Sequence, residues 1–344
     1  MNIVRRCMVF ILAAVLLAAP VTPAGAIDQD VTDVYTTAEP SPRQIVQEEA
    51  RASVLDRFQF RGFVDLQQGY DNNVDLDPSR HKDGFLQTTA NGEVVYNATE
   101  AIDLKAGSDL FSMVYYTYNE NNLLDVSPYI GIDIDITPDI VWKNKFTFDY
   151  FSYPNDKEST FSGIKFSSFL RQYFMKDVYH EIGAEVLKRW FPDRKVAMAN
   201  AELGNKDRED GRFRLQYNIG GFFYDAFIRV SNEYSRNNSN YSFQDFYDFQ
   251  SYRLRPSVMY FFTDQLYADI ALLYRYVDYK DRRNTEDIDQ TVSNHNFTFI
   301  SSAYYDITRN VTLGVTYSYN ENVSNDPFEE YSGSVVSGGV FVSF

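Results

Sequence analysis

The last fourteen residues of the sequence, Tyr331–Phe344, follow a period of two. In an extended strand, successive side chains point to opposite faces. One face of this stretch therefore carries Val336, Val340, Val342 and Phe344. The other face carries mainly small residues, Gly333, Ser337, Gly339 and Ser343, together with Val335 and Phe341. The pattern predicts an amphipathic β-strand that finishes on an aromatic residue.

The start of the sequence has the pattern of a secretory signal peptide, which we place at 1–26. Arg5 and Arg6 precede the apolar run Val9–Ala19, and small residues at 24–26 offer a cleavage site. This segment predicts an exported protein.

Cys7 is the only cysteine and lies within that segment, so the mature chain would have no disulfide. An exported protein without disulfides needs another source of stability, and a closed barrel that pairs every backbone group supplies one. Residues 27–56 are acidic and mixed in composition, and we expect a short periplasmic lead-in segment there.

Composition favours a β-structured membrane protein. Asp and Glu number 48 against 32 Lys and Arg, for a net charge of −16, so nucleic acid is not an expected partner. After residue 26 no apolar run approaches the ~20 residues of a helical span, whereas tilted strands of ~9–11 residues remain compatible. The 27 tyrosines and 28 phenylalanines fit the aromatic girdles that barrels place at both membrane interfaces.

From residue 57 onward, alternation of period two recurs in fourteen segments. We predict strands at 58–71, 84–97, 102–119, 124–137, 139–152, 160–175, 177–191, 211–224, 226–236, 249–262, 265–280, 292–306, 311–320 and 332–344. Tight turns alternate with longer polar loops, the tight turns falling at 97–100, 137–139, 176–177, 224–225, 263–264 and 308–310. This rhythm predicts an all-β fold over 57–344: a transmembrane, antiparallel, up-and-down β-barrel of about 14 strands. A soluble antiparallel sandwich or barrel is the alternative, because its strands also alternate.

The longest predicted loop, 192–210, contains a short helix candidate at 196–203. Such a segment would either fold into the lumen and narrow it or cap the barrel from outside.

One short motif, Gly69-Tyr70-Asp71-Asn72-Asn73-Val74, closes the first predicted strand directly before an acidic loop. Together with the signal peptide, the hairpin rhythm and the terminal Phe344, it resembles the porin-type β-barrel families of bacterial outer membranes. The resemblance implies location in the bacterial outer membrane, contact with outer-membrane lipid, and Phe344 as the assembly signal read by the outer-membrane barrel assembly machinery. It also implies a channel, without indicating a particular substrate.

Relatives that translocate lipoproteins look like a large helical-repeat domain followed by a barrel. Here about thirty residues separate the predicted signal peptide from the first strand. This difference argues against a translocator role.

Residue patterns typical of metal sites or catalytic sites are weak in this sequence. Oxygen-bearing residues alternate from Asp71 to Asp77 as at the start of a calcium loop, but Leu76 occupies the place of the turn glycine and Lys82 that of the closing glutamate. The three histidines are scattered, at His81, His180 and His295, and no G-x-S-x-G motif is present. We expect no metal, no cofactor and no enzymatic activity.

The residues predicted to face the lumen say most about the function. In the segment 311–320 the larger apolar residues share the odd positions and are assigned to lipid, so the even positions face the lumen. The same parity elsewhere predicts these pore-lining residues: Glu93, Asp109, Asp133, Asp135, Lys143, Arg214, Arg253, Arg255 and Arg275. Acidic residues gather in the second to fourth strands and arginines in the eighth to eleventh.

Two functions fit this arrangement. Opposite charge on opposite walls favours a channel for passive diffusion of small hydrophilic solutes or ions. A lumen lined by aromatic residues would instead favour the barrel component of an exopolysaccharide export system. A third reading is that the charges pair off and fill the lumen as a buried network.

Overall fold

The computed structural model describes residues 57–344, except 78–79, 176, 199, 201 and 244–245. Fourteen strands run through these described residues. They are β1 (Phe58–Asp71), β2 (Asp83–Thr99), β3 (Ile102–Tyr115), β4 (Leu123–Thr137), β5 (Ile140–Ser152), β6 (Phe161–Met175), β7 (Val178–Ala197), β8 (Leu203–Phe223), β9 (Ala226–Ser239), β10 (Phe249–Phe261), β11 (Leu266–Arg283), β12 (Thr291–Asp306), β13 (Val311–Ser324) and β14 (Tyr331–Ser343).

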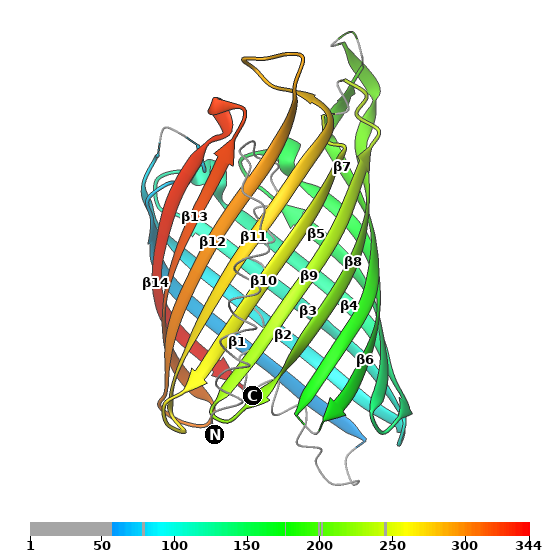
Figure 1. The fold of residues 1–344 in the computed structure, drawn as a ribbon, viewed down its shortest axis with the longest axis vertical. Coiled ribbons are helices and arrows are strands. Elements are labelled where there is room, and N and C mark those ends of the chain that lie inside the picture. Colours follow the sequence, from blue (N-terminus) through cyan, green and yellow to red (C-terminus); the bar gives the residue numbers. More distant parts are fainter. Residues whose placement is uncertain (1–56, 78–79, 176, 199, 201, 244–245) are drawn as a thin grey trace, which may run out of the picture.

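Each strand pairs antiparallel with its neighbours in sequence, and β14 pairs with β1, so the sheet closes into a barrel (Figure 1). The predicted all-β, up-and-down barrel of about 14 strands is confirmed. Tight connections gather at the end where the chain finishes, which we call the turn end, and longer hairpins rise at the opposite end, which we call the loop end (Figure 1). The predicted signal peptide (1–26) and lead-in segment (27–56) lie outside the described residues and stay predictions.

The largest error of the sequence analysis concerns the hairpin of β7 and β8. The predicted loop at 192–210 and its helix candidate at 196–203 are wrong, because pairing continues through Phe191↔Arg208 and Lys195↔Asp207 to Ala197↔Leu203. Both faces of this extension carry polar residues, so the sequence lacks the apolar alternation by which the other strands were found. Cross-strand ion pairs such as Lys195 with Asp207 hold it together.

Smaller corrections concern strand ends. The strand predicted at 102–119 ends at Tyr115, where the backbone N–H donates to the side chain of Asn122 at 2.7 Å and the chain turns away. In the described part of the chain, three short 3₁₀ helices occupy the loop end: η1 (Asn119–Asn121), η2 (Lys157–Ser159) and η3 (Pro327–Glu329). Among the described residues, no helix is long and apolar enough to cross a membrane.

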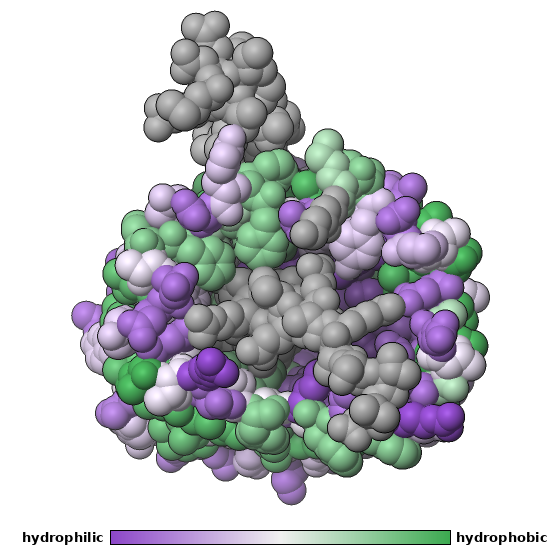
Figure 2. All heavy atoms as spheres, turned by 90° about the horizontal axis from the view of Figure 1, so that it is seen from below, coloured by the Kyte–Doolittle hydropathy of each residue, from purple (hydrophilic) through white to green (hydrophobic). Residues whose placement is uncertain are grey.

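The register sorts the side chains into two faces. Outward positions carry large apolar residues on every side of the barrel, including Phe146, Ile182, Leu215, Ile270 and Val315, which are between 44% and 59% exposed. Seen from the turn end, apolar side chains surround the ring and are interleaved with hydrophilic ones (Figure 2). Folding thus leaves an unusually large apolar area uncovered, which in a protein marks a surface made for another apolar phase.

Gly62 makes room for the end of the chain at the seam between β14 and β1. Gly62 and Phe344 exchange two backbone hydrogen bonds of 3.0 Å each. The Phe344 ring lies where a side chain on Gly62 would begin, with its Cε2 atom 2.6 Å from the position of that Cβ. A glycine is therefore required for the terminal ring to pack across the seam.

Candidate functional site

The inward face holds all nine residues that the sequence analysis assigned to the lumen. Residues that lie directly opposite each other on neighbouring strands point to the same face, so the strand register carries the assignment around the barrel. Examples of such pairs are Asp133↔Lys143, Glu185↔Arg214 and Arg253↔Arg275. The nine residues therefore share one continuous face of the barrel. Their contacts divide them into two groups, on opposite sides of the ring.

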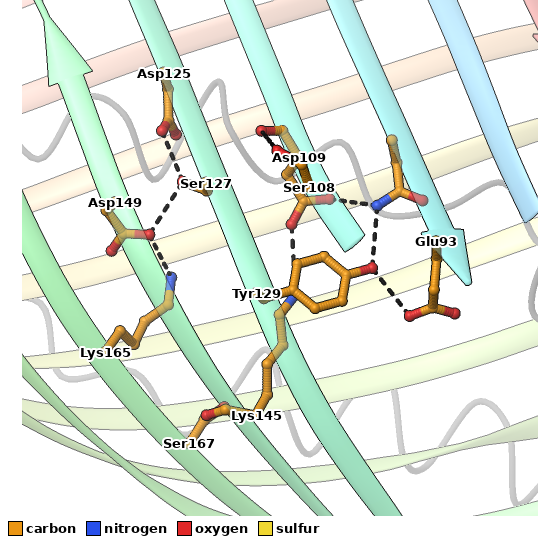
Figure 3. A network of polar contacts seen from close by, with 11 residues as sticks. Glu93, Ser108, Asp109, Asp125, Ser127, Tyr129, Lys145, Asp149, Lys165 and Ser167 are labelled. Atoms are coloured by element: carbon orange, nitrogen blue, oxygen red, sulfur yellow. Dashed lines mark hydrogen bonds and ion pairs between the residues drawn. The ribbon is translucent and has the colours of Figure 1, made fainter. Parts of the chain in front are cut away.

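The first group centres on Tyr129 of β4 (Figure 3). Its hydroxyl donates to Glu93 at 2.9 Å and receives an Asn91 N–H at 3.3 Å. Asn91 also donates to Asp109 at 2.6 Å. The Lys145 ammonium lies 3.5 Å from the centre of the Tyr129 ring and 3.4 Å from Asp109. The Tyr129 side chain thus contacts Glu93, Asn91 and Lys145, and the last two connect it to Asp109. The network joins β2, β3, β4 and β5.

A second branch of this network lies beside the first (Figure 3). The Ser127 hydroxyl lies 2.8 Å from Asp125 and 3.0 Å from Asp149, bridging the two carboxylates, and Lys165 pairs with Asp149 at 3.6 Å. The single hydroxyl proton of Ser127, which lies within reach of both carboxylates, and the Lys165 cation offset the repulsion between the two acids. The acidic wall is therefore held in a defined arrangement.

A cavity of about 270 Å³ opens in this wall. Its lining comes from β2 to β7: Glu93, Lys105, Tyr129, Gly131, Asp133, Lys143, Asn144, Lys145, Ser167, Phe169, Arg171 and Glu181. Lys105 pairs with Asp133 at 3.0 Å, and Arg171 pairs with Glu181 at 2.9 Å. Lys143 lies directly across the strand pair from Asp133, while Asp135 lies two residues further along β4. The cavity thus has charged groups of both signs around it.

The second group is the basic wall, organised by Glu233 of β9. This carboxylate accepts from Arg253 at 3.1 Å and from Gln216 at 3.0 Å, and it lies 3.9 Å from Arg214. Arg214 also pairs with Glu185 at 3.1 Å.

The remaining predicted arginines extend this wall. Arg275 is the cross-strand neighbour of Arg253, and Arg255 that of Ser231. Cations outnumber acids in this part of the lumen. In the closed ring of fourteen strands, β10 lies seven strands from β3, so the two walls stand opposite each other.

The ion pairs described above, such as Lys145 with Asp109 and Arg253 with Glu233, each join residues of the same wall. The sequence analysis placed acids opposite arginines, but it did not predict that their partners lie beside them. Asp109 is nevertheless 50% exposed and Lys145 40%, so pairing leaves room for water at this height.

Aromatic residues inside the barrel were missed by the sequence analysis, which assigned the aromatic content to lipid-facing girdles. At the loop end a packed cluster lines the inner face, made of Val74, Phe85, Phe111, Met113, Tyr115, Leu123, Phe151, Phe161, Phe191 and Val335. A second cluster, Tyr179, Phe227, Met259 and Tyr267, lies at the turn end. Their positions share the parity of the charged lumen residues, which is the signal that would have revealed them.

The Gly-Tyr-Asp-Asn-Asn-Val motif fastens the first loop to the last strand. Asn73 is fully buried, and its amide donates to the carbonyl oxygens of Asp77 at 2.9 Å and Ser332 at 3.1 Å. The Asn72 side chain accepts the Ser334 N–H at 2.7 Å. Asp71 accepts the Asn73 N–H at 2.8 Å. The motif therefore seals the β1–β14 seam at the loop end, as Phe344 does at the turn end.

Replacing Asn73 by alanine is expected to lower the free energy of unfolding by about 2–3 kcal/mol, because two half-buried carbonyl groups lose their donor and the buried amide leaves a gap. Guanidinium unfolding of the barrel in detergent micelles measures this loss. The exposed Asn205 provides the matched control, and its replacement by alanine is expected to change stability by less than about 0.5 kcal/mol. Equal effects from the two variants would contradict a role of Asn73 at the seam.

The loop oxygens do not converge on a common point. Asp71 is turned to Asn73 and Tyr115, whereas Asp75 contacts His81 and Asn121. Within the described part of the chain, no group of three or more His, Cys, Asp or Glu residues has the geometry of a metal site. The other histidines lie apart: His180 contacts Gln172, and His295 contacts Tyr274.

Fold and inner face together define the class of this protein: a closed fourteen-strand β-barrel with an apolar exterior and a charged interior. No family model matches the chain, and no curated protein matches it. Among solved structures it is similar to OmpT of Vibrio cholerae without its loop L8, an outer membrane protein, with a TM-score of 0.47 and 9% identity over 84% of this chain and 100% of that one. It is also similar to the anion-selective porin of Comamonas acidovorans, with a TM-score of 0.46 and 8% identity over 83% of this chain and 99% of that one. A bacterial polysaccharide outer membrane secretin matches with a TM-score of 0.44 and 7% identity over 82% of this chain and 97% of that one.

Proposed function

We propose that this protein is a bacterial outer-membrane channel through which small hydrophilic solutes or ions diffuse passively. The apolar outer face supports the membrane location, because large exposed side chains such as Phe146 and Ile182 would be costly in water and favourable in lipid. The closed sheet supports it further, because a barrel leaves no strand edge unpaired in lipid.

The channel function rests on one observation: the middle of the inner face is charged and open to water. Asp109 is 50% exposed and Lys145 40% exposed, beside a cavity of about 270 Å³. Side chains that only filled the interior of a barrel would be buried, as Glu185 and Arg212 are at 8% and 4%. A wet, charged stretch of lumen offers solutes an environment close to water.

Single-channel recording tests this proposal. The refolded barrel in planar bilayers is expected to give discrete conductance steps, and proteoliposomes containing it should swell in iso-osmotic solutions of small sugars. Absence of both conductance and swelling, with a folded barrel shown by heat-modifiable migration on gels, would overturn the channel function.

The aromatic clusters on the inner face support a second candidate, the barrel component of an exopolysaccharide export system. Aromatic rings are suited to stack against sugar rings. Their tight packing argues against this role, however, since Phe85, Met113 and Phe151 are only 1–3% exposed and contact one another instead of the passage. If the barrel exported polysaccharide, long oligosaccharides would enter the lumen and interrupt the single-channel current. We expect no such interruption by oligosaccharides of about ten sugars.

Topology follows from the outer-membrane location, with the turn end and the end of the chain in the periplasm. Cysteines placed at Asn238 or Glu286, both exposed at the loop end, are expected to react with a membrane-impermeant maleimide on intact cells. Cysteines at Asp264 or Asn310, exposed at the turn end, should react only after lysis. The neighbouring Asn284 is unsuitable because it is 5% exposed and anchors its loop. Equal labelling of the two sets on intact cells would contradict this orientation.

A further inference from the structure

The start of β1 places the preceding chain at the mouth of the barrel. The described residues begin with Arg57, and β1 pairs antiparallel with β14, so Arg57 and the end of the chain lie at the same end, the turn end. The lead-in segment, 27–56, is therefore tethered to the rim of the lumen. A tether of this kind gives the segment an effective concentration in the millimolar range at the inner face.

The lead-in segment is acidic. It has seven acids and two arginines, for a formal charge of −5: Asp28, Asp30, Asp33, Glu39, Arg43, Glu48, Glu49, Arg51 and Asp56. A tethered segment with this charge is attracted to a positive surface within reach and repelled by a negative one.

The inner face offers one surface of each kind. Between the Arg208–Asp210 pair and the turn end, the basic wall on β8 to β11 has six arginines and two acids: Arg212, Arg214, Arg229, Glu233, Arg253, Arg255, Asp269 and Arg275. On β2 to β5, the acidic wall has seven acids and three lysines: Glu93, Asp103, Lys105, Asp109, Asp125, Asp133, Asp135, Lys143, Lys145 and Asp149. The two walls thus carry opposite net charge.

Pairing within the basic wall does not cancel its charge. Glu233 is shared, with Arg253 at 3.1 Å and Arg214 at 3.9 Å. Glu185 of the neighbouring β7 adds one carboxylate, 3.1 Å from Arg214. Arginines outnumber carboxylates even with Glu185 included, so the wall stays positive whichever pairs form.

The lead-in segment is long enough to reach this wall. Arg229 lies three residues from Ala226, where β9 begins at the turn end, and so about 10 Å along the strand at ~3.3 Å per residue. Fourteen strands at ~4.8 Å, tilted by about 40°, form a ring about 28 Å across. Thirty residues span about 45 Å even as a helix, which covers the crossing and the height of the arginines.

We propose that the lead-in segment folds back into the lumen and docks along the basic wall, so that it narrows the passage. The remaining path follows the acidic wall, where Asp109 is 50% exposed. In this position the segment lies inside the barrel and not in the periplasm, where the sequence analysis placed it. The inference goes beyond the proposed channel function, because it makes the segment a regulator of the width of the channel.

Cross-linking tests the docking without reference to conductance. The only cysteine, Cys7, lies in the predicted signal peptide, so a single pair of cysteines can be introduced into the mature chain. Gln44→Cys or Thr37→Cys in the segment is combined with Ser257→Cys, because Ser257 is the cross-strand neighbour of Arg229 on the basic wall. The matched partner is Asn97→Cys, on the inner face of β2 near the turn end.

In detergent micelles, a bismaleimide of about 10 Å is expected to link the segment to position 257 at least about fivefold faster than to position 97, because the walls lie farther apart than its span. Equal rates for both walls, or no link to position 257 from either position of the segment, would overturn the docking. A link in a barrel that shows no conductance would retain the docking and reject the channel.

Conductance tests the narrowing. Replacing Glu39, Glu48 and Glu49 by glutamine lowers the formal charge of the segment from −5 to −2 and is expected to release it. A helix is about 10 Å across with its side chains, and the open lumen about 18 Å, so release should raise the single-channel conductance about 1.5-fold at 0.1 M salt. The matched triple variant removes Glu158, Glu286 and Asp289, which are exposed in the outer loops, and should keep the natural conductance. Equal conductance of the two triple variants would overturn the narrowing.

Salt and a soluble polyanion identify the occupant of the basic wall. At 1 M salt, where the Debye length is about 3 Å, the natural channel and the variant with glutamines at 39, 48 and 49 should conduct equally. At 0.1 M salt, hexaglutamate is expected to block that variant at a concentration at least about tenfold below the one that blocks the natural channel, because the tethered segment competes at millimolar effective concentration. Equal sensitivity of the two proteins would mean that the segment does not cover the basic wall, and would overturn the proposal.

Discussion

Replacement of Phe344 by aspartate is expected to lower the folding equilibrium constant of the barrel about a hundredfold and, with it, the yield of folded protein. In the proposed outer-membrane location, the outward side of β14 meets the membrane interface at the turn end, where the Phe344 ring covers Gly62. The variant loses about 2 kcal/mol of apolar transfer and adds up to about 1 kcal/mol for a charge at the interface. The sum of about 3 kcal/mol corresponds to roughly two decades in the folding equilibrium.

Phe341→Ser is the matched control for this prediction. Phe341 lies in the same strand but on the inner face, where its ring stacks on Phe63 at a centroid distance of 5.2 Å. Replacement by serine removes this ring contact, worth about 1 kcal/mol, and the area of a ring that is only half-buried, and it places no charge at the interface, so the loss is expected to be smaller than for Phe344→Asp. Comparable yields from the two variants, measured by heat-modifiable migration of membrane extracts, would contradict the assignment of faces.

Two routes lead from Phe344→Asp to a low yield, and refolding separates them. If the seam contact with Gly62 dominates, the variant also fails to fold from urea into detergent micelles. If the residue acts as the signal for the assembly machinery, refolding in vitro proceeds and only the cellular yield falls. We expect losses in both, larger in cells.

The strands could be predicted from the sequence because lipid and lumen demand different side chains at alternate positions. Where that demand holds, as in Val311–Tyr319, period two is visible. The strand predicted at 311–320 begins with β13, which continues for four more residues to Ser324. The extension of β7 and β8 at the loop end, 192–197 with 203–210, shows no such pattern. Strand pairing in this extension depends on opposite charges on the two strands, such as Lys195 and Asp207. Alternation along a single strand does not reveal such pairs.

The faces of the candidate site were also predictable, but its contacts were not. Parity places Asp109 and Arg253 on the inner face without any knowledge of neighbours. Which cation meets Asp109 depends on the register of two further strands, and the register places Lys145 within reach. The cavity depends in addition on two glycines. The Tyr129 ring lies over Gly107 and the Phe169 ring over Gly183, and without these glycines the rings would project into the cavity.

The second large effect concerns ion selectivity, and it follows from the basic wall. At low salt the natural channel is expected to prefer cations weakly, because the formal net charge of −16 attracts them to the mouth while the two walls balance in the lumen. Replacing Arg253 and Arg255 by serine removes two positive charges from that wall. Glu233 then loses its 3.1 Å partner and retains Arg214 at 3.9 Å.

The size of the change follows from Coulomb's law in water. A unit charge at about 8 Å from a passing ion contributes about 0.5 kcal/mol at ε ≈ 80, so two charges shift the energy of a cation by about 1 kcal/mol. The permeability ratio of K⁺ to Cl⁻ should therefore rise at least about fivefold, read from the reversal potential in a salt gradient. The difference is expected to fade between 0.1 M and 1 M salt, as the Debye length falls from about 10 Å to about 3 Å.

A matched double variant decides whether position or total charge is responsible. Arg236→Ser with Arg309→Ser removes the same charge from exposed sites outside the lumen, on the outward face of β9 and in a tight turn. Selectivity should remain within about twofold of the natural channel, because both sites are screened from the passage. If the two double variants shift the reversal potential equally, Arg253 and Arg255 do not line the ion path. If the inner variant alone shifts it, the basic wall sets the balance against the acidic wall, and ions pass between them.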